Sequence, residues 1–280
     1  MKIKRIIPLW ARILIVGFKS KIVDVIFTPR IPKLHACDTI TLGTEYGCKT
    51  FVPLSSLHSS TVISAGCGED ISFDIEMARK FNTDIILIDP TPRAIKHVSD
   101  VLRRIGLPAS ASLNHTGCQL TTAYDLQNIR SSQLRFIPKA LFEREGIISL
   151  FPPKNSSHVS YSFINISKTV LDVHSEIINC EATTIERIMK SYEITNIEIL
   201  KLDIEGAQLE VIRNMFSLNI KPKQILIEID ELYFPSLKGK KRAKICFSLL
   251  LKNGYVMVGK ENKFDFCFIQ KSELTKYLDK

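Results

Sequence analysis

The feature that most constrains the fold is an alternation of strand-like and helix-like segments that begins at Thr61 and continues to about residue 252. Short apolar runs rich in β-branched residues alternate with longer segments in which apolar residues recur every three or four positions. This alternation is typical of βαβ units around a mostly parallel sheet. The predicted strands cover residues 61–65, 84–88, 134–141, 197–202 and 224–229, and the predicted helices cover residues 70–81, 92–105, 184–192, 205–218 and 237–252.

The last segment of the chain departs from this alternation. Residues 255–258 and 264–269 are apolar runs separated by five residues that include Gly259 and Asn262, which predicts an antiparallel hairpin. With the five preceding strands, the expected fold is α/β: a doubly wound, mostly parallel seven-stranded sheet ending in an antiparallel hairpin. Thr183 followed by Glu186 predicts a capping box at the fourth helix. Residues 151–179 are predicted to be a long irregular substrate loop.

Most of the positive charge lies before this alternating region. The net charge is +9, and residues 2–33 hold eight Lys or Arg against Asp24 alone, so this segment carries seven of the nine charges. Residues 34–280 are nearly neutral, which argues against a nucleic-acid-binding groove on the folded part. We therefore expect a basic N-terminal segment (1–33), a main domain (34–280) with its core at 61–231, and no nucleic-acid partner.

The N-terminal segment is amphipathic but too interrupted by charges to span a bilayer. On a helix that begins near Pro8, Arg12 and Lys19 share one face, and Trp10 and Ile13 lie on the other. This pattern fits an interfacial helix on a membrane surface, and it equally fits a helix packed on its own domain or on a second subunit of a homo-oligomer. The seven cysteines are scattered without a C-x-x-C pair, which favours reduced thiols in a cytoplasmic protein, with membrane association through residues 1–33 left open.

A glycine-rich turn follows the first strand of the alternating region. Ala65, Gly66, Cys67, Gly68 and Glu69 join a buried strand to a helix, so that backbone can approach a ligand closely near a helix N-terminus. A second element follows where Asp89 and Pro90 end the next strand, 21 residues after Gly68. A carboxylate there can accept hydrogen bonds from both ribose hydroxyls of a nucleoside. The structural alternative is a tight turn followed by a solvent-facing aspartate.

NAD is the rival ligand for such a turn. Its fingerprint has a third glycine three residues after the second, where this chain has Ile71. A β-branched side chain at that position disfavours the close helix contact that a pyrophosphate needs. An NAD-linked oxidoreductase is therefore the least favoured functional hypothesis for this chain.

Two carboxylates follow the fourth predicted strand. Asp203 and Glu205 lie at its carboxyl edge, where ligands of open α/β sheets bind. Either side chain could act as a general base, position a substrate or bind a cation. We take Asp203 as the first candidate and Glu205 as the second, because Glu205 could also act only by stabilising a helix N-terminus. No histidine or cysteine spacing predicts a metal site.

These landmarks together resemble a known family. The turn 65–70, the strand end 88–92, and above all the segment Lys201-Leu202-Asp203-Ile204-Glu205-Gly206-Ala207 resemble successive motifs of the FkbM-type methyltransferases. The resemblance covers residues 61–231. It implies a Rossmann-like class I methyltransferase domain over residues 34–280, S-adenosylmethionine as the cofactor, and methyl transfer to an oxygen.

The resemblance also implies roles for particular residues. Gly66, Cys67 and Gly68, flanked by Ala65 and Glu69, would lie along the methionine end of the cofactor. Asp89, followed by Pro90, would hold the ribose, and Ala140 at the end of the third strand would lie near the adenine. The acceptor would be a small molecule or glycan: a hydroxyl of a sugar, a glycolipid or a secondary metabolite.

The chain departs from the family pattern at three positions. Ser64 replaces an acidic residue that often lies two before the first glycine, Asp70 stands where many class I enzymes have a third glycine, and Asp230 replaces a histidine. These changes leave the identity of the base open. A catalytically inactive scaffold that keeps the fold is the leading alternative function, and the intact set of Gly66, Gly68 and Asp89 argues against it.

Overall fold

The computed structural model describes residues 37–152, 161–163, 177–232, 236–261 and 264–279. The expectations for residues 1–33 and for most of the irregular segment 151–179 concern residues outside these ranges. Over the described residues, no helix has both the length and the hydropathy needed to cross a bilayer.

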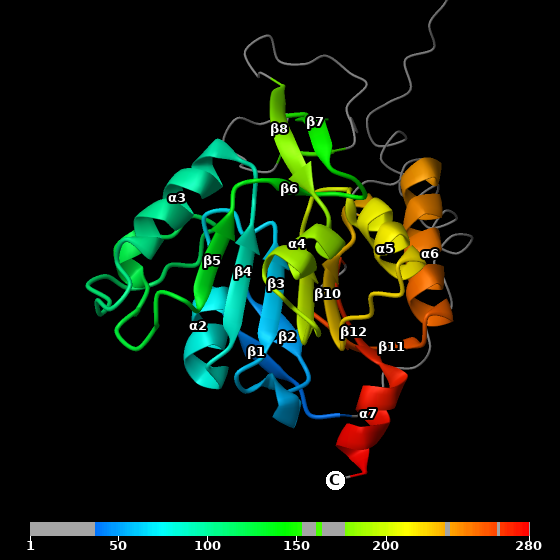
Figure 1. Ribbon diagram of the computed structural model, residues 1–280, viewed down its shortest axis with the longest axis horizontal. Helices are drawn as coiled ribbons and strands as arrows, with labels where there is room; N and C mark the ends of the chain where they lie inside the picture. The colour runs from blue at the N-terminus through cyan, green and yellow to red at the C-terminus, as the bar shows by residue number, and fades with distance from the viewer. Residues whose placement is uncertain (1–36, 153–160, 164–176, 233–235, 262–263, 280) are drawn as a thin grey trace, which may run out of the picture.

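The centre of the fold is a seven-stranded sheet with the strand order β11-β12-β10-β9-β3-β4-β5 (Figure 1). Six of the seven strands point in the same direction, and β12 alone in this sheet is antiparallel, to both β10 and β11. This confirms the predicted mostly parallel sheet that ends in a hairpin. The strands are β3 (Thr61–Ala65), β4 (Asp84–Ile88), β5 (Leu134–Ile137), β9 (Ile199–Leu202), β10 (Gln224–Glu228), β11 (Tyr255–Lys260) and β12 (Asp265–Gln270).

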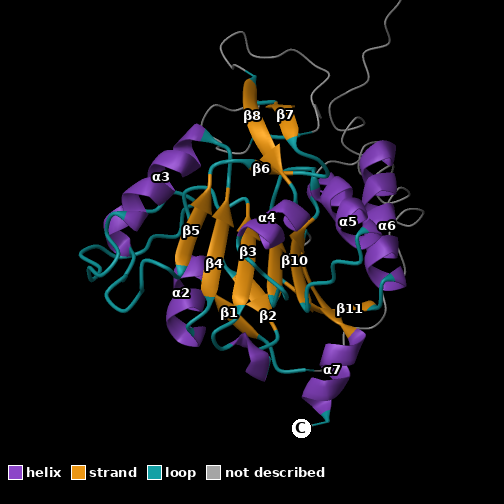
Figure 2. Cartoon of the chain, viewed as in Figure 1, coloured by secondary structure: helices purple, strands orange, loops and turns teal. Residues whose placement is uncertain are grey.

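Both faces of this sheet are covered, which explains why its strands are continuous apolar runs rather than alternating ones. One face packs on the first core cluster and the other on the second, so neighbouring residues of β4 such as Ile85 and Ile86 enter different cores. Figure 2 shows helices on either side of the strands. The first face carries β1 (Ile40–Leu42), β2 (Lys49–Phe51), α2 (Ser72–Phe81), α3 (Pro92–Leu102) and α7 (Lys271–Leu278), and the second carries α4 (Ile185–Ser191), α5 (Gln208–Ser217) and α6 (Leu237–Lys252). Three short 3-10 helices, η1 (Ser55–Leu57), η2 (Thr121–Ala123) and η3 (Asp230–Leu232), lie in the connections.

The third predicted strand, 134–141, is wrong in its second half. The strand of the large sheet ends at Ile137, because Pro138 has no N–H to donate to the ladder and Lys139 N turns back to bond Ile137 O at 2.8 Å. Ala140 therefore does not end a strand of the large sheet. It lies in β6 (Ala140–Leu141), which joins β8 (Ile178–Thr183) and β7 (Gly146–Leu150) in a separate three-stranded sheet.

Three helix starts also differ from the prediction, and the first is α2, which begins at Ser72 rather than at Asp70. The helix expected from Glu205 begins at Gln208, because Glu205 and Gly206 have φ values of 50° and 95°, which a right-handed helix does not allow. The capping residue of α4 is Thr184 rather than Thr183, and its hydroxyl accepts a hydrogen bond from Arg187 N at 3.1 Å. Thr183 is still part of β8.

Candidate cofactor and acceptor site

The glycine turn after β3 is held in a conformation that only glycine adopts easily. Gly66 and Gly68 have φ values of 76° and 55°. A Cβ at Gly66 would lie 1.6 Å from the carbonyl oxygen of Asp203, which is impossible without moving one of the two strand ends. Gly66 is therefore the contact point between the turn after β3 and the end of β9. At Gly68 a Cβ would meet no atom within 4 Å, so this part of the turn faces open space.

Asp89, the predicted ribose ligand, is fixed against this turn. Its Oδ2 accepts a hydrogen bond from Gly68 N at 2.9 Å, and its Oδ1 accepts from Thr91 N at 2.9 Å and Thr91 Oγ1 at 2.6 Å. The side chain is buried, and burial raises its pKa although these three donors oppose the shift. Because a carboxylate offers about four acceptor positions, one remains for a ligand. Asp89 thus ties the ends of β3 and β4 together.

The other predicted residues of the turn lie around this point. Ala65 ends β3, and Cys67 is buried, which raises the pKa of its thiol. Glu69 Oε2 lies 2.5 Å from Arg93 Nη2 at the start of α3, and half-buried Pro90 follows Asp89. Ala140 is apart from this group because it belongs to the small sheet, which Figure 1 shows beyond the carboxyl ends of β3 and β4.

A buried lysine to which the sequence analysis assigned no role lies beneath the turn. Lys201 is in β9, and its Nζ donates a hydrogen bond to Gly66 O at 2.7 Å and lies 3.8 Å from Asp203 Oδ2. It is the register neighbour of Ser64 in β3. Burial raises the pKa of nearby Asp74 to about 6, while the Lys201 charge opposes that shift. Asp74, from α2, therefore supplies a buried carboxyl on the side of the turn where Ser64 replaces the family acid.

Three carboxyl groups form a row across adjacent strand ends. Asp203 follows β9 one residue after Leu202, Glu228 occupies the same level of β10, and Asp265 pairs with Glu228 from β12. Lys49 of β2 lies against this row, with its Nζ 2.6 Å from Asp265 Oδ1 and 3.5 Å from Asp203 Oδ2. Lys49 is itself buried, and the surrounding carboxylates raise its pKa despite the opposing effect of burial. The sequence suggested Asp203 alone.

Asp203 and Glu228 are linked by a hydrogen bond and differ sharply in acidity. The negative charge of Asp203, followed by burial, raises the pKa of Glu228 to about 10. Burial opposes ionisation of Asp203, but Lys49 and Lys201 outweigh it and hold the pKa of Asp203 below its usual range. At neutral pH the pair therefore keeps one proton, which lies on Glu228, and the ionised Asp203 accepts the hydrogen bond.

Glu205, the second predicted catalytic residue, sits on a strained turn that organises the site. Its carbonyl oxygen accepts hydrogen bonds from Phe163 N at 3.1 Å and Ser162 Oγ at 3.0 Å, which ties the described part of the 151–179 segment to the end of β9. The following residue, Gly206, donates its N–H to Asp230 Oδ2 at 2.8 Å. Burial, with Glu205 next, raises the pKa of Asp230. Asp230, which replaces a family histidine, thus holds the Glu205 turn in place.

The loop between β1 and β2 brings a tyrosine to the same edge. The Tyr46 side chain is 65% exposed, and a Cβ at Gly117 would lie 2.4 Å from its ring. Burial of part of the phenol and the charges of Asp203, Glu228 and Glu205 raise the pKa of Tyr46. The phenol therefore lies within range of an electrostatic interaction with the carboxyl row.

Asp70, which stands where many class I enzymes have a third glycine, links two loops to α2. Its Oδ2 accepts hydrogen bonds from Thr44 Oγ1 at 2.5 Å and Gln119 Nε2 at 3.2 Å, and its Oδ1 accepts from Ser72 N at 3.0 Å. The carboxylate joins the β1–β2 loop and the loop around Gln119 to the start of α2. These loops are the ones that carry Tyr46 and Gly117.

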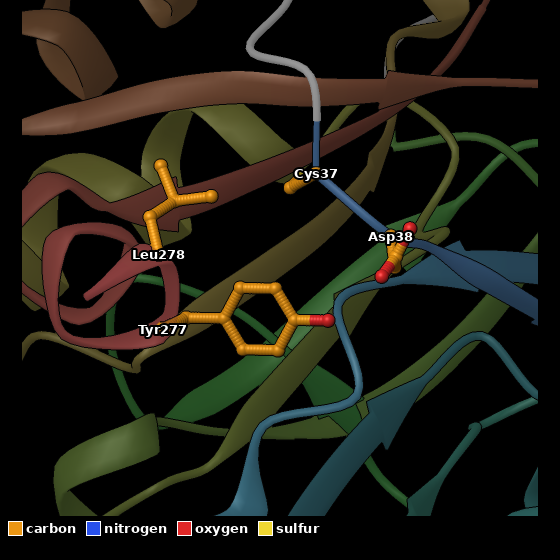
Figure 3. A pocket seen from close by; sticks show the side chains of 4 residues that line it. All are labelled: Cys37, Asp38, Tyr277 and Leu278. Atoms are coloured by element: carbon orange, nitrogen blue, oxygen red, sulfur yellow. The ribbon is translucent and has the colours of Figure 1, made fainter. Parts of the chain in front are cut away.

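A surface pocket lies elsewhere, at the end of the molecule where α7 packs. It measures ≈ 580 Å³ and is lined by Cys37, Asp38, Tyr277 and Leu278 (Figure 3). None of the predicted site residues lines it. Its lining offers one carboxylate, one thiol and one phenol, and no feature of the glycine turn or the carboxyl row.

Comparison with known proteins gives the family. No curated protein matches the chain. A family model described as the methyltransferase FkbM domain matches residues 47–257, which run from just before β2 into β11 and include the glycine turn, Asp89, Asp203 and Glu228. The match covers well over half of the 280 residues. The chain therefore belongs to the FkbM methyltransferase domain family and is a methyltransferase.

Proposed function

We propose that this protein transfers a methyl group from S-adenosylmethionine to a hydroxyl oxygen of a sugar, a glycolipid or a secondary metabolite. The observation that carries the proposal is the arrangement at the carboxyl edge of the sheet: a glycine turn with an open side at Gly68, the buried acceptor Asp89 beside it, and the ionised Asp203 in contact with the same turn.

The residues at this edge fit the proposed cofactor. The space beside Gly68, which a Cβ would enter, leaves room for ligand atoms close to the backbone. Asp89 keeps acceptor capacity for a ribose hydroxyl while its other bonds fix its orientation. Gly66, Cys67 and Gly68, with Ala65 and Glu69, would line the methionine end, and Pro90 would border the ribose. Contact between Ala140 and the adenine stays a prediction, and it would require the small sheet to border the cofactor.

The cofactor would supply an electrophilic methyl group on a good leaving group, so the protein's task is to position and desolvate the acceptor. Asp203 is suited to orient the acceptor hydroxyl, because Lys49 and Lys201 keep it ionised and its position is fixed by the β3–β9 contact. Glu205 follows two residues later on a turn held by Asp230, and it remains the second candidate.

The surroundings of Asp203 support a hydroxyl-rich acceptor. Carboxylates accept hydrogen bonds from hydroxyl groups, and the exposed ring of Tyr46 offers an apolar face beside them. Among the candidate acceptors, this combination favours a sugar ring over an extended apolar metabolite.

Calorimetric titration with S-adenosylmethionine separates the enzyme from an inactive scaffold. We expect saturable binding of S-adenosylmethionine and none of NAD. Loss of binding in a folded Asp89→Ala variant would support the assigned cofactor site, and a wild-type protein that binds neither ligand would favour the scaffold.

A further inference from the structure

We propose that Asp203 and Glu228 act as one carboxyl pair that takes up the proton released by methyl transfer, and that the positive charge of the cofactor governs when the pair holds that proton. The inference rests on the proposed use of S-adenosylmethionine. Glu228 acts through Asp203, as its proton-sharing partner.

The pair is built by strand register. Leu202 of β9 and Ile227 of β10 are partners in a parallel ladder, so the next residue of each strand, Asp203 and Glu228, lies at the same level on the same face. The two carboxyl groups share a hydrogen bond. Two carboxyl groups within hydrogen-bonding distance cannot both ionise easily, so a proton stays between them unless positive charge is added.

The groups that face the pair come from every element around it. Lys49 approaches from β2 and Lys201 from β9, with Nζ atoms 3.5 Å and 3.8 Å from Asp203 Oδ2. Asp265 of β12 faces Glu228 and is bonded to Lys49. Asp230 adds negative charge from η3, Glu205 lies near enough to interact with Asp230, and the phenol of Tyr46 interacts with both carboxyls of the pair. The two lysines alone do not remove the proton, so a third positive charge nearby can decide its position.

The cofactor turn is the place from which such a charge would act. Gly66 touches the Asp203 carbonyl so closely that no side chain fits between them. Lys201 bridges the two, because its Nζ bonds Gly66 O at 2.7 Å. A sulfonium bound along residues 66–68 would thus lie beside the pair. It would favour the form in which both carboxyls are ionised.

The proposed reaction steps balance in protons and electrons. Binding of the positively charged cofactor expels the Glu228 proton to solvent. The acceptor hydroxyl then gives its proton to Asp203, its oxygen lone pair forms the new O–CH₃ bond, and the C–S bond breaks with its electrons going to sulfur. The products are a methyl ether, the neutral thioether S-adenosylhomocysteine, and a pair that again holds one proton.

The test is to count the protons exchanged on binding, because S-adenosylmethionine and S-adenosylhomocysteine differ mainly by the methyl group and its charge. Isothermal titrations at about pH 9, each repeated in two buffers of different ionisation enthalpy, give the number of protons released per ligand bound. We expect S-adenosylmethionine to release on the order of one proton more than S-adenosylhomocysteine.

Two variants locate the effect. Glu228→Gln keeps a hydrogen-bonding group beside Asp203 but holds no exchangeable carboxyl proton, so it should bind both ligands with equal proton release. Glu231→Gln is the matched control. Glu231 is also a buried glutamate with a pKa raised by burial, but it pairs with Arg242 at 2.8 Å, so the control should keep the wild-type difference.

The outcomes separate this inference from the proposed function. Equal proton release for the two ligands in the wild-type protein, or a difference that persists in Glu228→Gln, would overturn the pair while leaving the methyltransferase assignment intact. Failure of the wild-type protein to bind S-adenosylmethionine would overturn the cofactor assignment and the pair with it. The wild-type comparison decides the question even if Glu228→Gln does not fold.

Discussion

Replacing each of the two glycines of the cofactor turn by alanine should have different consequences. At Gly66 the new Cβ would lie 1.6 Å from the Asp203 carbonyl oxygen, at a φ of 76° that already costs an alanine roughly 1–2 kcal/mol. Relief of the clash requires the ends of β3 and β9 to separate, which disturbs a packed core and adds roughly 1–3 kcal/mol. Gly66→Ala should therefore lower the free energy of unfolding by about 2–5 kcal/mol, a large part of the roughly 5–15 kcal/mol typical of a domain.

Gly68→Ala should behave differently because its Cβ meets nothing within 4 Å. Only the backbone strain at φ 55° remains, so the loss of stability should be about 1 kcal/mol. The methyl group would instead enter the space assigned to the cofactor and weaken binding of S-adenosylmethionine. Gly106→Ala is the control, since Gly106 also has positive φ and an open Cβ direction but lies outside the site.

Urea unfolding and calorimetric titration of the three variants measure these effects. We expect a large stability loss for Gly66→Ala and a small one for both Gly68→Ala and Gly106→Ala. Of the latter two variants, only Gly68→Ala should bind the cofactor more weakly. Equal stability losses at Gly66 and Gly68 would refute the close contact with Asp203. Unchanged cofactor affinity in Gly68→Ala would refute the position of the cofactor.

The remaining predictions concern the charged groups. Asp89→Ala should weaken cofactor binding by about 1–3 kcal/mol in calorimetry, since it removes an ionised acceptor, and unchanged affinity in a folded variant would contradict the assignment. Burial raises the folded-state pKa of Asp74 to about 6, so the stability that the protonated Asp74 contributes is full below about pH 4 and is lost as the pH rises through about 6. Asp74→Asn should remove roughly 2–3 kcal/mol of this pH dependence of the free energy of unfolding, measured in urea. An unaltered pH profile would contradict the raised pKa of Asp74. Asp203→Asn should keep affinity for S-adenosylhomocysteine, which carries no sulfonium charge, and lose roughly 10²–10⁴-fold in turnover, whereas a larger loss in Glu205→Gln would transfer the role to Glu205. The basic segment 1–33 should cosediment with anionic liposomes in a salt-sensitive manner, each well-placed Lys or Arg contributing about 1 kcal/mol; no binding would favour self-association instead.

The sequence predicted the large sheet well because its strands are buried on both faces and read as continuous apolar runs. It failed where the local signal is weak. The three residues of β1 and of β2 are too few to show a period, and β7 is a short, largely exposed strand, so no buried face imposes an alternating pattern on its five residues. The break at Pro138, which moves Ala140 into the small sheet, was visible as a residue that cannot donate to a ladder.

The site was predictable only in its local parts. Gly66, Gly68, Asp89 and Asp203 each stand at a strand end, which the sequence can locate. The Lys49–Asp265 ion pair joins residues 216 positions apart, so it depends on how β2 crosses the hairpin end of the sheet and has no local signature. The link between Asp203 and Glu228 depends in the same way on strand adjacency.

Assigning the strand order reveals the carboxyl row at once. Once β10 is placed beside β9 and β12 beside β10, Glu228 and Asp265 fall level with Asp203. Strand order is the information that a single sequence did not contain.

The most direct test of the account is transfer of an isotopically labelled methyl group from S-adenosylmethionine to extracts of the producing cell, followed by identification of the labelled product. The wild-type protein should give a labelled methyl ether on a hydroxyl-rich compound, and a folded Asp203→Asn variant should give a greatly reduced yield. Label found on nitrogen or carbon would contradict the proposed O-methylation, and equal labelling by the two proteins would contradict the role of Asp203.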